Sequence, residues 1–423
     1  MALVRRAAAE KIPLTIAGAG TGVTGGRVPF GGWVVSLERF RRLDIRAGSA
    51  TVGSGVLLRE VHEAAARHGQ FYPPDPTETA ASIGGTIATN ASGARSFRYG
   101  ATRAHVLGLR VVLADGRLLA MSRGDKVDFP VPSLPLPATT KHTAGYFLRP
   151  GMDWVDLFVG SEGTLGVITE AELHLLPAPP ALLAGVIFFS GDEEAVDAVE
   201  AWRGAAPARM LEYFDRPSLD LLRGRFPEIP ARASAAILFE QELTSEDDPE
   251  IDRWQERLEA SAALIDNSWF ATSARDRERF RQFRHALPEI VNTIVRRNGV
   301  LKMNSDYAVP LERNREMLAY YRRRLEEEFP GRYVIFGHIG DAHVHVNVLP
   351  ASGQEAQRAA ELMLEFARTA VRLGGTVSAE HGLGKRKAHL LAVQYAPEHL
   401  NAMRAVKRRL DPNWLLGAGT LWR

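Results

Sequence analysis

The sequence predicts an α+β protein in two parts, and three features of the chain support this prediction. In residues 1–178, short apolar segments alternate with loops rich in glycine and other small residues. After the proline-rich residues 177–180, strands and amphipathic helices alternate, which favours an antiparallel sheet with helices on one face. Residues 333–349 (YVIFGHIGDAHVHVNVL) carry three histidines between two apolar segments, as expected of two strands joined by a tight turn.

The composition excludes several classes of protein. The 423 residues are enough for two or more domains, and a net charge of +2 favours neither nucleic acid nor an anionic membrane as a partner. The chain has no cysteine, which excludes disulfides and any iron–sulfur cluster held by this chain alone. No apolar run reaches the roughly 18–20 residues that span a bilayer. We therefore expect a cytoplasmic, non-transmembrane protein, either free or peripherally attached to the inner membrane.

The first part is predicted to contain short strands, few helices and long loops. The N-terminal segment has the pattern of the second half of an amphipathic helix, and a further helix is predicted over 56–68. The small residues of 73–93 suit a main chain that lies against a large flat ligand. Strands are predicted at 13–17, 33–37, 50–53, 105–113 and 117–121, and a strand–loop–strand unit over 157–170.

Residues 18–26 (GAGTGVTGG) form a dense glycine loop directly after the first strand. Backbone N–H groups of such a loop approach phosphate oxygens closely, and Thr21 and Thr24 add hydroxyl donors. Residues 20–25 also satisfy the dinucleotide fingerprint G-x-G-x-x-G, but that fingerprint requires a helix to begin inside it. Here more glycines, Pro29 and then a strand follow, so we reject the match. A loop that is rich in glycine only for turning is the alternative to a phosphate site.

The second part is predicted to alternate strands and helices before the histidine-rich strands. A helix over 275–297 is expected to be broken or kinked near Pro288. It is followed by a strand over 300–310, a helix over 311–329 and, after the histidines, a helix over 355–373. Before these elements, strands are predicted at 184–189, 209–213 and 235–240, and helices at 193–202, 218–223 and 250–264.

His338, His343 and His345 fall within eight residues. A strand period of two places His343, His345 and Asn347 on one face and the intervening valines on the other. The polar outer face of an ordinary strand is one interpretation, and a metal or proton-transfer site is the other. The pair Glu380-His381 favours the second interpretation, because it supplies a carboxylate and a further imidazole.

Several motifs, in order along nearly the whole chain, resemble one known family. AGAGTGVTGG, PPDPTETAASIGGTIATNASG and GSEGTLGVITEAEL look like the FAD-binding domain of the vanillyl-alcohol oxidase and p-cresol methylhydroxylase (PCMH) flavoproteins. GHIGDAHVHVNV, SAEHGLGKRK and DPNWLL are similar to the branch with D-lactate dehydrogenases, D-2-hydroxyglutarate dehydrogenases and the glycolate oxidase flavoprotein subunit. The resemblance implies a two-subdomain PCMH-type FAD-binding domain at 1–178, a substrate or cap domain at 179–385, and a helical segment at 386–423 that returns to the FAD domain.

The resemblance implies FAD as cofactor and assigns residues to it. Members with covalent flavin often have a histidine in the first glycine loop, and none is present here, so we expect non-covalent FAD. The residues implied for the pyrophosphate are Gly18, Ala19, Gly20, Thr21, Gly22, Thr24, Gly25 and Gly26; for the flavin and ribityl chain Pro74, Thr77, Gly84, Gly85, Asn90, Gly93 and Ser96; and for the adenosine side Glu162, Gly163, Val167 and Ile168.

The resemblance also implies oxidation of a small 2-hydroxy acid, such as D-lactate, glycolate or 2-hydroxyglutarate, by hydride transfer to flavin N5. A divalent cation that contacts both substrate oxygens lowers the hydroxyl pKa, and imidazole with carboxylate suits zinc, with Mn²⁺ and Fe²⁺ as alternatives. By resemblance, the metal ligands are His338, His345 and Glu380, and the residues that act on the substrate are His381 as base, Asn347, and the cations Arg284 and Lys302.

The sequence departs from the family pattern at four places. Relatives usually have Asn at the position of His343. The role of His343 is therefore open: it is a fourth metal ligand, a residue that hydrogen-bonds to a ligand, or neither. The family lysine pairs with Asn304, so Lys302 is expected to substitute for it from the same strand face, with Lys385 and Lys387 as weaker candidates. The chain starts in the helix after the first two strands of the small FAD subdomain, which we expect to be incomplete. Residues 417–420 replace an Asn-Pro-Gly-Lys motif and remove one flavin contact.

Two other functions and several partners stay open at this point. One alternative is a non-catalytic FAD-binding subunit of an oxidase complex, and the other is an alkylglycerone-phosphate synthase-like transferase. The electron acceptor is undetermined, and an iron–sulfur partner subunit, a quinone, a cytochrome, an electron-transfer flavoprotein and dioxygen are all compatible with the sequence, as is a homodimer.

Overall fold

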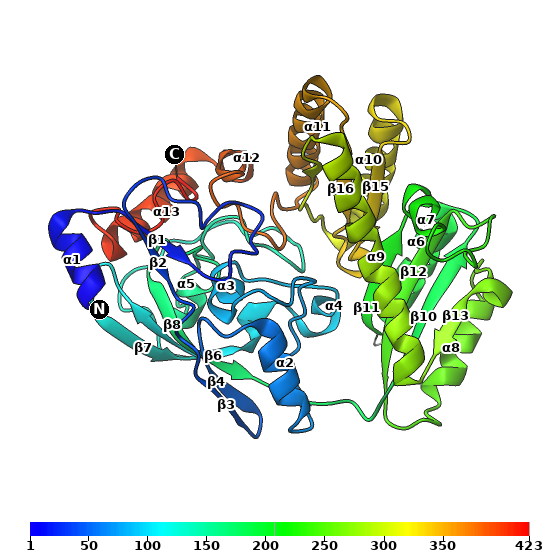
Figure 1. Ribbon diagram of the computed structural model, residues 1–423, viewed down its shortest axis with the longest axis horizontal. Helices are drawn as coiled ribbons and strands as arrows, with labels where there is room; N and C mark the ends of the chain where they lie inside the picture. The colour runs from blue at the N-terminus through cyan, green and yellow to red at the C-terminus, as the bar shows by residue number, and fades with distance from the viewer. Residues whose placement is uncertain (207, 423) are drawn as a thin grey trace.

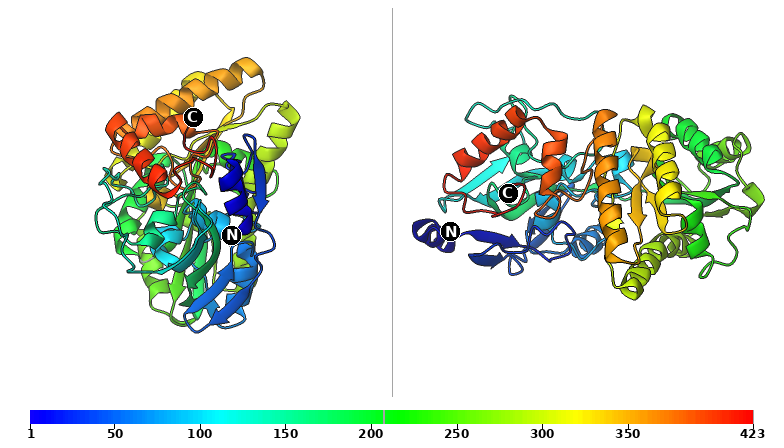
Figure 2. Two further views of the ribbon diagram at one scale, coloured as in Figure 1. Left: turned by 90° about the vertical axis from the view of Figure 1, so that its left-hand side faces the viewer. Right: turned by 90° about the horizontal axis from the view of Figure 1, so that it is seen from above.

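The chain forms two lobes, which Figure 1 shows side by side. The computed structural model describes residues 1–206 and 208–422. The helices and strands within residues 2–177 and 391–410 lie in the N-terminal lobe, and those within residues 181–372 lie in the C-terminal lobe. Both ends of the described chain therefore lie in the same lobe, as the two turned views in Figure 2 show. In the described part of the chain, no helix combines the length and the apolar character needed to cross a bilayer.

The N-terminal lobe is built on a five-stranded antiparallel sheet, with a small two-stranded parallel sheet beside it. Val52 and Val106 of the larger sheet share one core with Val61 and Ile87 of two covering helices. In sheet order the large sheet consists of β3 (Leu43–Arg46), β4 (Ser49–Gly53), β8 (Val167–His174), β6 (Val106–Val112) and β7 (Leu118–Ser122). The other elements are α1 (Ala2–Glu10), β1 (Leu14–Ala17), β2 (Trp33–Ser36), α2 (Leu58–Ala66), β5 (Gln70–Phe71), α3 (Ile83–Ala88), α4 (Ser96–Tyr99), α5 (Trp154–Phe158), β9 (Leu176–Pro177), α12 (Leu391–Gln394) and α13 (Pro397–Leu410).

The glycine loop joins two parallel strands, as the sequence predicts. β1 and β2 pair from Leu14 opposite Trp33, and residues 18–32 between them contain no helix. The prediction of a strand directly before the Gly-Ser-Glu-Gly loop is wrong, because residues 157 and 158 belong to α5. The Asp153 side chain caps this helix by accepting a hydrogen bond from the Asp156 N–H at 2.8 Å.

The C-terminal lobe confirms the predicted antiparallel sheet, which has seven strands. In sheet order they are β13 (Trp269–Ala271), β10 (Ala181–Phe189), β12 (Ala235–Leu243), β11 (Ala208–Phe214), β15 (Tyr333–Gly337), β16 (His345–Val348) and β14 (Met303–Asn304). The helices are α6 (Asp192–Ala205), α7 (Arg216–Leu222), α8 (Glu250–Glu259), α9 (Ala274–Asn298), α10 (Asn314–Glu328) and α11 (Gly353–Arg372).

Helices cover both faces of this sheet, whereas the sequence suggested one. Phe189 of β10 packs against Trp202 of α6, which in turn contacts Trp254 of α8. The neighbouring Phe188 points to the opposite face and shares a core with Phe283 of α9. Successive strand side chains alternate between faces, and β10 is almost entirely apolar, so both of its faces require a cover.

Two further predictions in this lobe change. Of the break or kink expected near Pro288, the break does not occur: α9 runs through the proline, because Leu287 and Val291 pack in the core on both sides of it, which outweighs one lost backbone hydrogen bond. The strand predicted over 300–310 is reduced to β14. Beyond β14, the Ser305 N–H still donates to the Val346 carbonyl of β16 at 3.0 Å, but the Asp306 carboxylate accepts backbone N–H groups of a distant loop and regular pairing ends.

Candidate active site

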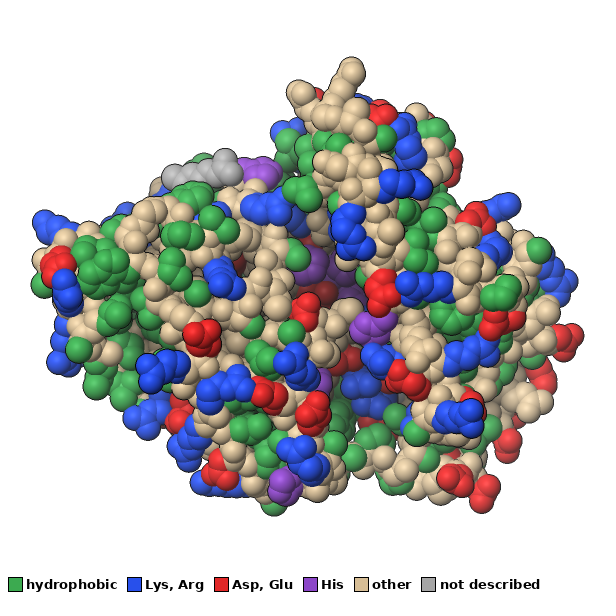
Figure 3. Space-filling model, viewed as in Figure 1, with side chains coloured by type: hydrophobic (Ala, Val, Ile, Leu, Met, Phe, Trp, Pro, Cys, Tyr) green, Lys and Arg blue, Asp and Glu red, His purple; other side chains and the backbone are tan. Residues whose placement is uncertain are grey.

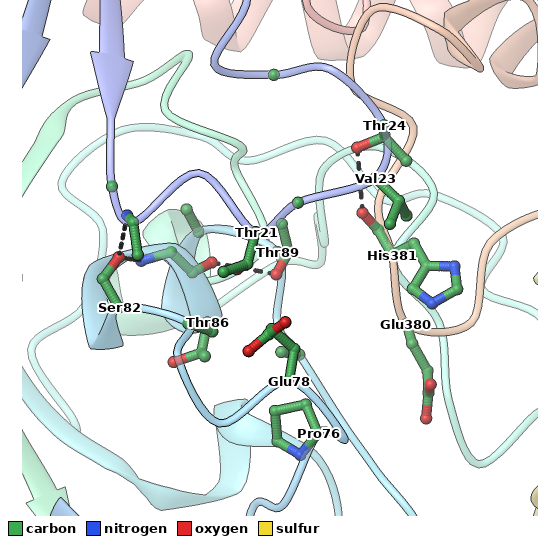
Figure 4. A pocket seen from close by; sticks show the side chains of 18 of the residues that line it. Thr21, Val23, Thr24, Pro76, Glu78, Ser82, Thr86, Thr89, Glu380 and His381 are labelled. Carbon is green, nitrogen blue, oxygen red and sulfur yellow. Dashed lines mark hydrogen bonds between the residues drawn. The ribbon is translucent and has the colours of Figure 1, made fainter. Parts of the chain in front are cut away.

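A cleft lies between the two lobes, and Figure 3 shows histidine side chains inside it. The N-terminal lobe contributes most of the glycine loop and parts of the segments 76–93 and 162–168. Figure 4 shows Ser82 and Thr86 on one side of the cleft and Glu380 and His381 on the other. The C-terminal lobe contributes Glu212, Arg284, Pro288, Phe336, Gly337, His338, His345, Glu380 and His381.

Most residues that the resemblance assigns to the cofactor line this cleft. They are Gly18, Ala19, Gly20, Thr21, Gly22, Thr24, Gly26, Thr77, Gly84, Gly85, Gly93, Glu162, Gly163 and Ile168. The sequence analysis did not single out Ser82, whose hydroxyl accepts from the N–H groups of Ala19 at 3.3 Å and Gly85 at 3.4 Å. Ser82 therefore ties the glycine loop to the first turn of α3.

Gly25, Pro74, Asn90, Ser96 and Val167 are not among the residues that line the cleft. Gly25 faces Arg386, and Val167 packs in the core with Leu14. The carbonyl of Pro74 lies 3.1 Å from His62 Nε2, and Asn90 Oδ1 accepts the Arg103 N–H at 2.8 Å. Ser96 accepts the N–H of Gly93 at 3.1 Å. In this structure these five residues contact other protein groups and not the cleft.

The glycines of the cleft have two different roles. A Cβ on Gly84 would lie 2.6 Å from the Ser54 Cβ, so Gly84 allows α3 to pack closely against the strand behind it. A Cβ on Gly22 or Gly26 would meet no protein atom within 4 Å. At these two positions the absence of a side chain leaves the backbone N–H groups accessible from the cleft, as expected of a loop that binds a pyrophosphate. The lining thus fits a dinucleotide held by backbone and small side chains.

The loop that carries Glu380 and His381 is fastened to the N-terminal lobe. The Thr24 carbonyl accepts the N–H groups of Lys385 and Arg386, both at 3.0 Å. Glu162 accepts the N–H groups of Leu383 at 2.9 Å and Gly384 at 2.7 Å. Gly384 has φ +53, and a Cβ there would lie 2.3 Å from the Thr24 carbonyl oxygen. Residues more than 350 positions apart in the sequence thereby form one wall of the cleft.

Three imidazoles surround the Glu380 carboxylate. His338 Nε2 lies 3.3 Å from Glu380 Oε1, His343 Nδ1 lies 3.8 Å from the same oxygen, and His345 Nε2 lies 3.8 Å from Oε2. One ligand atom from each of these four residues lies within 4.8 Å of all the others. Atoms that share a first-row metal at about 2.0–2.2 Å lie roughly 3–4 Å apart, so the group can hold a metal ion.

The electrostatics of the cluster also fit a cation. Burial alone lowers the pKa of His338, but Glu212 and Glu380 outweigh it and raise the pKa to about 9. Burial raises the pKa of Glu380, yet His338 and Lys141 hold it well below its usual range. Burial, together with the neighbouring His343, keeps the pKa of His345 well below 6.5, so that this ring is a neutral donor. The field that attracts a proton to His338 attracts a metal cation in the same way.

Lys141 is a buried residue of this cluster that the sequence analysis missed. Its ammonium donates to Glu380 Oε1 at 2.7 Å and to the Gly93 carbonyl at 3.0 Å, and it lies 3.0 Å from Asp341 Oδ2. Ser92 also donates to Glu380 Oε1 at 2.9 Å. Two N-terminal-lobe donors thus orient the central carboxylate of a cluster whose imidazoles come from the other lobe.

His381 lies next to the cluster, with Asp306 behind it. Its ring stacks on that of His345 with centroids 5.5 Å apart, and its Nδ1 lies 3.4 Å from Asp306 Oδ1. Burial lowers the pKa of His381 below its ordinary value of 6.5, although Asp306 opposes this. The ring is therefore neutral near pH 7 and able to accept a proton.

The cations proposed for a substrate carboxylate lie in different places. Arg284 lines the cleft and donates its Nε–H to Glu212 at 2.9 Å. Lys302 and Asn347 do not belong to the lining residues, although Asn347 shares a strand face with His345. Lys385 donates to the Val28 carbonyl and Lys387 to the Asn304 carbonyl.

Some sequence signals for the missed residues existed. Glu212 is a lone acid in the otherwise apolar core of a buried strand, MLEYF, and such a residue needs a partner. Asp306, which comes shortly after β14, is likewise an acidic residue that is fully buried and therefore needs a partner. Lys141 stands in a loop without periodicity, and no local pattern distinguishes it from a surface lysine.

Comparison with known proteins gives consistent results for both lobes. Residues 1–122 match the family described as FAD binding domain, and residues 179–421 match FAD linked oxidases, C-terminal domain. The fold is similar to that of alkyldihydroxyacetonephosphate synthase, with a TM-score of 0.70 at 16% identity over 98% of this chain and 73% of that one.

Curated relatives match over nearly the whole chain. A D-lactate dehydrogenase of Archaeoglobus fulgidus is 33% identical, covering 100% of this chain and 88% of the relative. The glycolate oxidase subunit GlcD of Bacillus subtilis is 31% identical, with 98% and 84% covered. A D-2-hydroxyglutarate dehydrogenase of Xanthomonas citri is 31% identical, with 100% and 86% covered. Together with the cleft described above, these matches show that the chain belongs to the family of FAD-linked oxidases.

Proposed function

We propose that this protein oxidises a small 2-hydroxy acid to the 2-oxo acid, with non-covalent FAD and a divalent cation. One observation carries the proposal. Glu380 belongs to the group of three histidines and one carboxylate that can hold a metal ion, and the next residue, His381, presents a neutral imidazole to the same cleft. Bound FAD would supply a hydride acceptor, and a bound divalent cation would supply the charge that lowers the pKa of the substrate hydroxyl. His338, His345 and Glu380 would hold the cation, and the glycine loop would hold the FAD pyrophosphate.

His381 acts as the general base in this proposal. An imidazole that directs Nδ1–H toward a carboxylate such as Asp306 leaves Nε2 free to accept the substrate hydroxyl proton. The lowered pKa of His381 keeps this nitrogen unprotonated near neutral pH. Asp306 would then stabilise the ring once it has taken the proton.

Arg284 binds the substrate carboxylate in this proposal. Arg284 lines the cleft, and Glu212 fixes the orientation of its guanidinium by accepting the Nε–H. Asn347 and Lys302 are given weaker roles, as outer neighbours of the substrate, because neither lines the cleft. D-lactate, glycolate and 2-hydroxyglutarate are the candidate substrates, and zinc is the first candidate cation.

A partner chain is part of the proposal. One relative is named as a subunit of glycolate oxidase, and this chain has no cysteine with which to hold an iron–sulfur cluster itself. Electrons would therefore leave the flavin to an iron–sulfur subunit, another protein carrier or a quinone.

A substrate screen with the purified holoprotein tests the proposed function. D-lactate, glycolate and D-2-hydroxyglutarate are each added anaerobically while flavin absorbance near 450 nm is followed, and turnover is then measured with a dye acceptor. We expect at least one acid to bleach the flavin and a chelator to abolish bleaching without releasing FAD. Failure of every 2-hydroxy acid to reduce metal-loaded, FAD-loaded protein would overturn the proposal in favour of a non-catalytic subunit or a synthase-like transferase.

A further inference from the structure

We propose that His343 is a fourth protein ligand of the cation, binding through Nδ1 with Asp306 behind its Nε2. The inference builds on the cation site of the proposed function and extends it by one residue. It would give this protein a donor set of three imidazoles and one carboxylate. Three observations on the ring of His343 carry it.

The first observation is that all three imidazoles have the same arrangement. Each ring directs one nitrogen toward Glu380, at 3.3 Å for His338 and 3.8 Å for His343 and His345. The second nitrogen of each ring faces an outer acceptor: His338 Nδ1 lies 2.5 Å from Glu212, His343 Nε2 lies 3.3 Å from Asp306 Oδ1, and His345 Nδ1 lies 3.4 Å from the Ser305 carbonyl. An imidazole with the metal on one side and a carboxylate or carbonyl on the other is the usual arrangement of a histidine ligand.

The second observation is the burial of His343. Its side chain has no exposed surface, its Nδ1 has no hydrogen-bond partner among the described residues, and its Nε2 faces only the Asp306 carboxylate at 3.3 Å, without the geometry of a full hydrogen bond. A buried polar group without a partner costs about 1–3 kcal/mol. A cation held near Glu380 would remove that cost, because it would give Nδ1 a partner and leave the ring proton on Nε2, which faces Asp306.

The third observation is how the backbone delivers the ring. His343 lies in the turn before β16, after Ala342 with φ +51, and its N–H donates to the His338 carbonyl at 3.1 Å. This turn places the His343 ring 4.5 Å from that of His345 and 5.4 Å from that of His338, between centroids. The ring is therefore held inside the cluster by backbone geometry.

X-ray absorption spectroscopy of the zinc-loaded holoprotein tests the inference directly. The outer-shell scattering counts the imidazoles on the metal, and we expect three for the natural protein and two for His343→Asn. Metal affinity, measured by competition with a chromophoric chelator, should fall at least about tenfold in His343→Asn. His345→Asn serves as the matched ligand control, with the same loss of one imidazole.

Both readouts are independent of substrate turnover. A protein that oxidises no 2-hydroxy acid but shows three imidazoles on the metal would refute the proposed function and keep this inference. Two imidazoles in the natural protein, or unchanged metal affinity in His343→Asn, would overturn the inference and leave the proposed function intact. If His343→Asn does not fold, the imidazole count of the natural protein still decides.

Discussion

The two walls of the cleft are built by opposite means. The N-terminal wall presents backbone and small side chains: Gly22 and Gly26 have open space where a Cβ would stand, and Ser82 joins the loop to α3. The opposite wall presents charged side chains: Glu380 lies among imidazoles, and the ammonium of Lys141 reaches it from the N-terminal lobe. The first wall suits a ligand that the main chain approaches closely, whereas in our proposal the second wall binds a cation and a substrate by charge. Substitutions in the two walls should therefore have separable consequences.

The largest effect is expected for Glu380→Gln. The amide cannot balance His338 and Lys141, so metal content should fall and turnover should drop by about 10³-fold or more, while FAD stays bound to the other wall. Metal analysis, flavin absorbance and dye reduction measure the three quantities. Glu361→Gln, at an exposed position of α11, is the control. Full metal content in Glu380→Gln would show that the charged wall does not depend on this carboxylate.

His381→Asn is expected to lower kcat by about 10²–10⁴-fold while metal and FAD content stay unchanged. Because protonation inactivates a base whose pKa lies below 6.5, the rate of the natural enzyme should decline only in the acid range below that value. The pH profile of the residual rate in the variant should lack this decline. An identical acid limb in His381→Asn would assign the proton acceptor to another group.

Gly84→Ala should damage the fold more than it damages FAD binding. The new Cβ would lie 2.6 Å from the Ser54 Cβ and 3.0 Å from the Ser54 carbonyl, and such overpacking costs about 1–3 kcal/mol. Urea unfolding of the apoprotein measures this loss. A stability equal to that of the natural protein would show that α3 moves freely away from Ser54.

Gly22→Ala should give the reverse result. Its Cβ meets no protein atom, so apoprotein stability should stay within about 0.5 kcal/mol, while FAD affinity falls about tenfold because the main chain no longer approaches the ligand closely. Flavin fluorescence titration measures the affinity. Together with Gly84→Ala, this variant separates glycines that serve packing from glycines that serve the ligand.

The smallest effect is expected for Lys302→Met, because Lys302 does not line the cleft. KM for the substrate should change by less than about twofold, whereas Arg284→Met should raise it at least about tenfold by removing a charge-assisted pair. Steady-state kinetics on both variants decide which cation faces the carboxylate. A larger rise for Lys302→Met than for Arg284→Met would reverse the assignment.

The sequence predicted motifs better than it predicted their surroundings. The strand–glycine loop–strand unit and the antiparallel sheet were predictable because a glycine run and apolar periodicity are local signals. The continuity of α9 through Pro288 was not, since it depends on core contacts of Leu287 and Val291. Likewise the last two residues of α5 were predicted as the start of a strand, because the helix is too short to reveal a period, and the Asp153 cap marks its beginning.

By itself, the sequence determined which chemical groups are available: a bare glycine loop, three closely spaced histidines and a Glu-His pair. Only the tertiary structure decided that these groups share one cleft, and that Lys141, Asp306 and Glu212 complete the charged wall. The physical reason is that a carboxylate or ammonium can be buried only with partners of opposite charge or donor character. Such partners come from whichever segments the fold brings near, and sequence spacing carries no record of them.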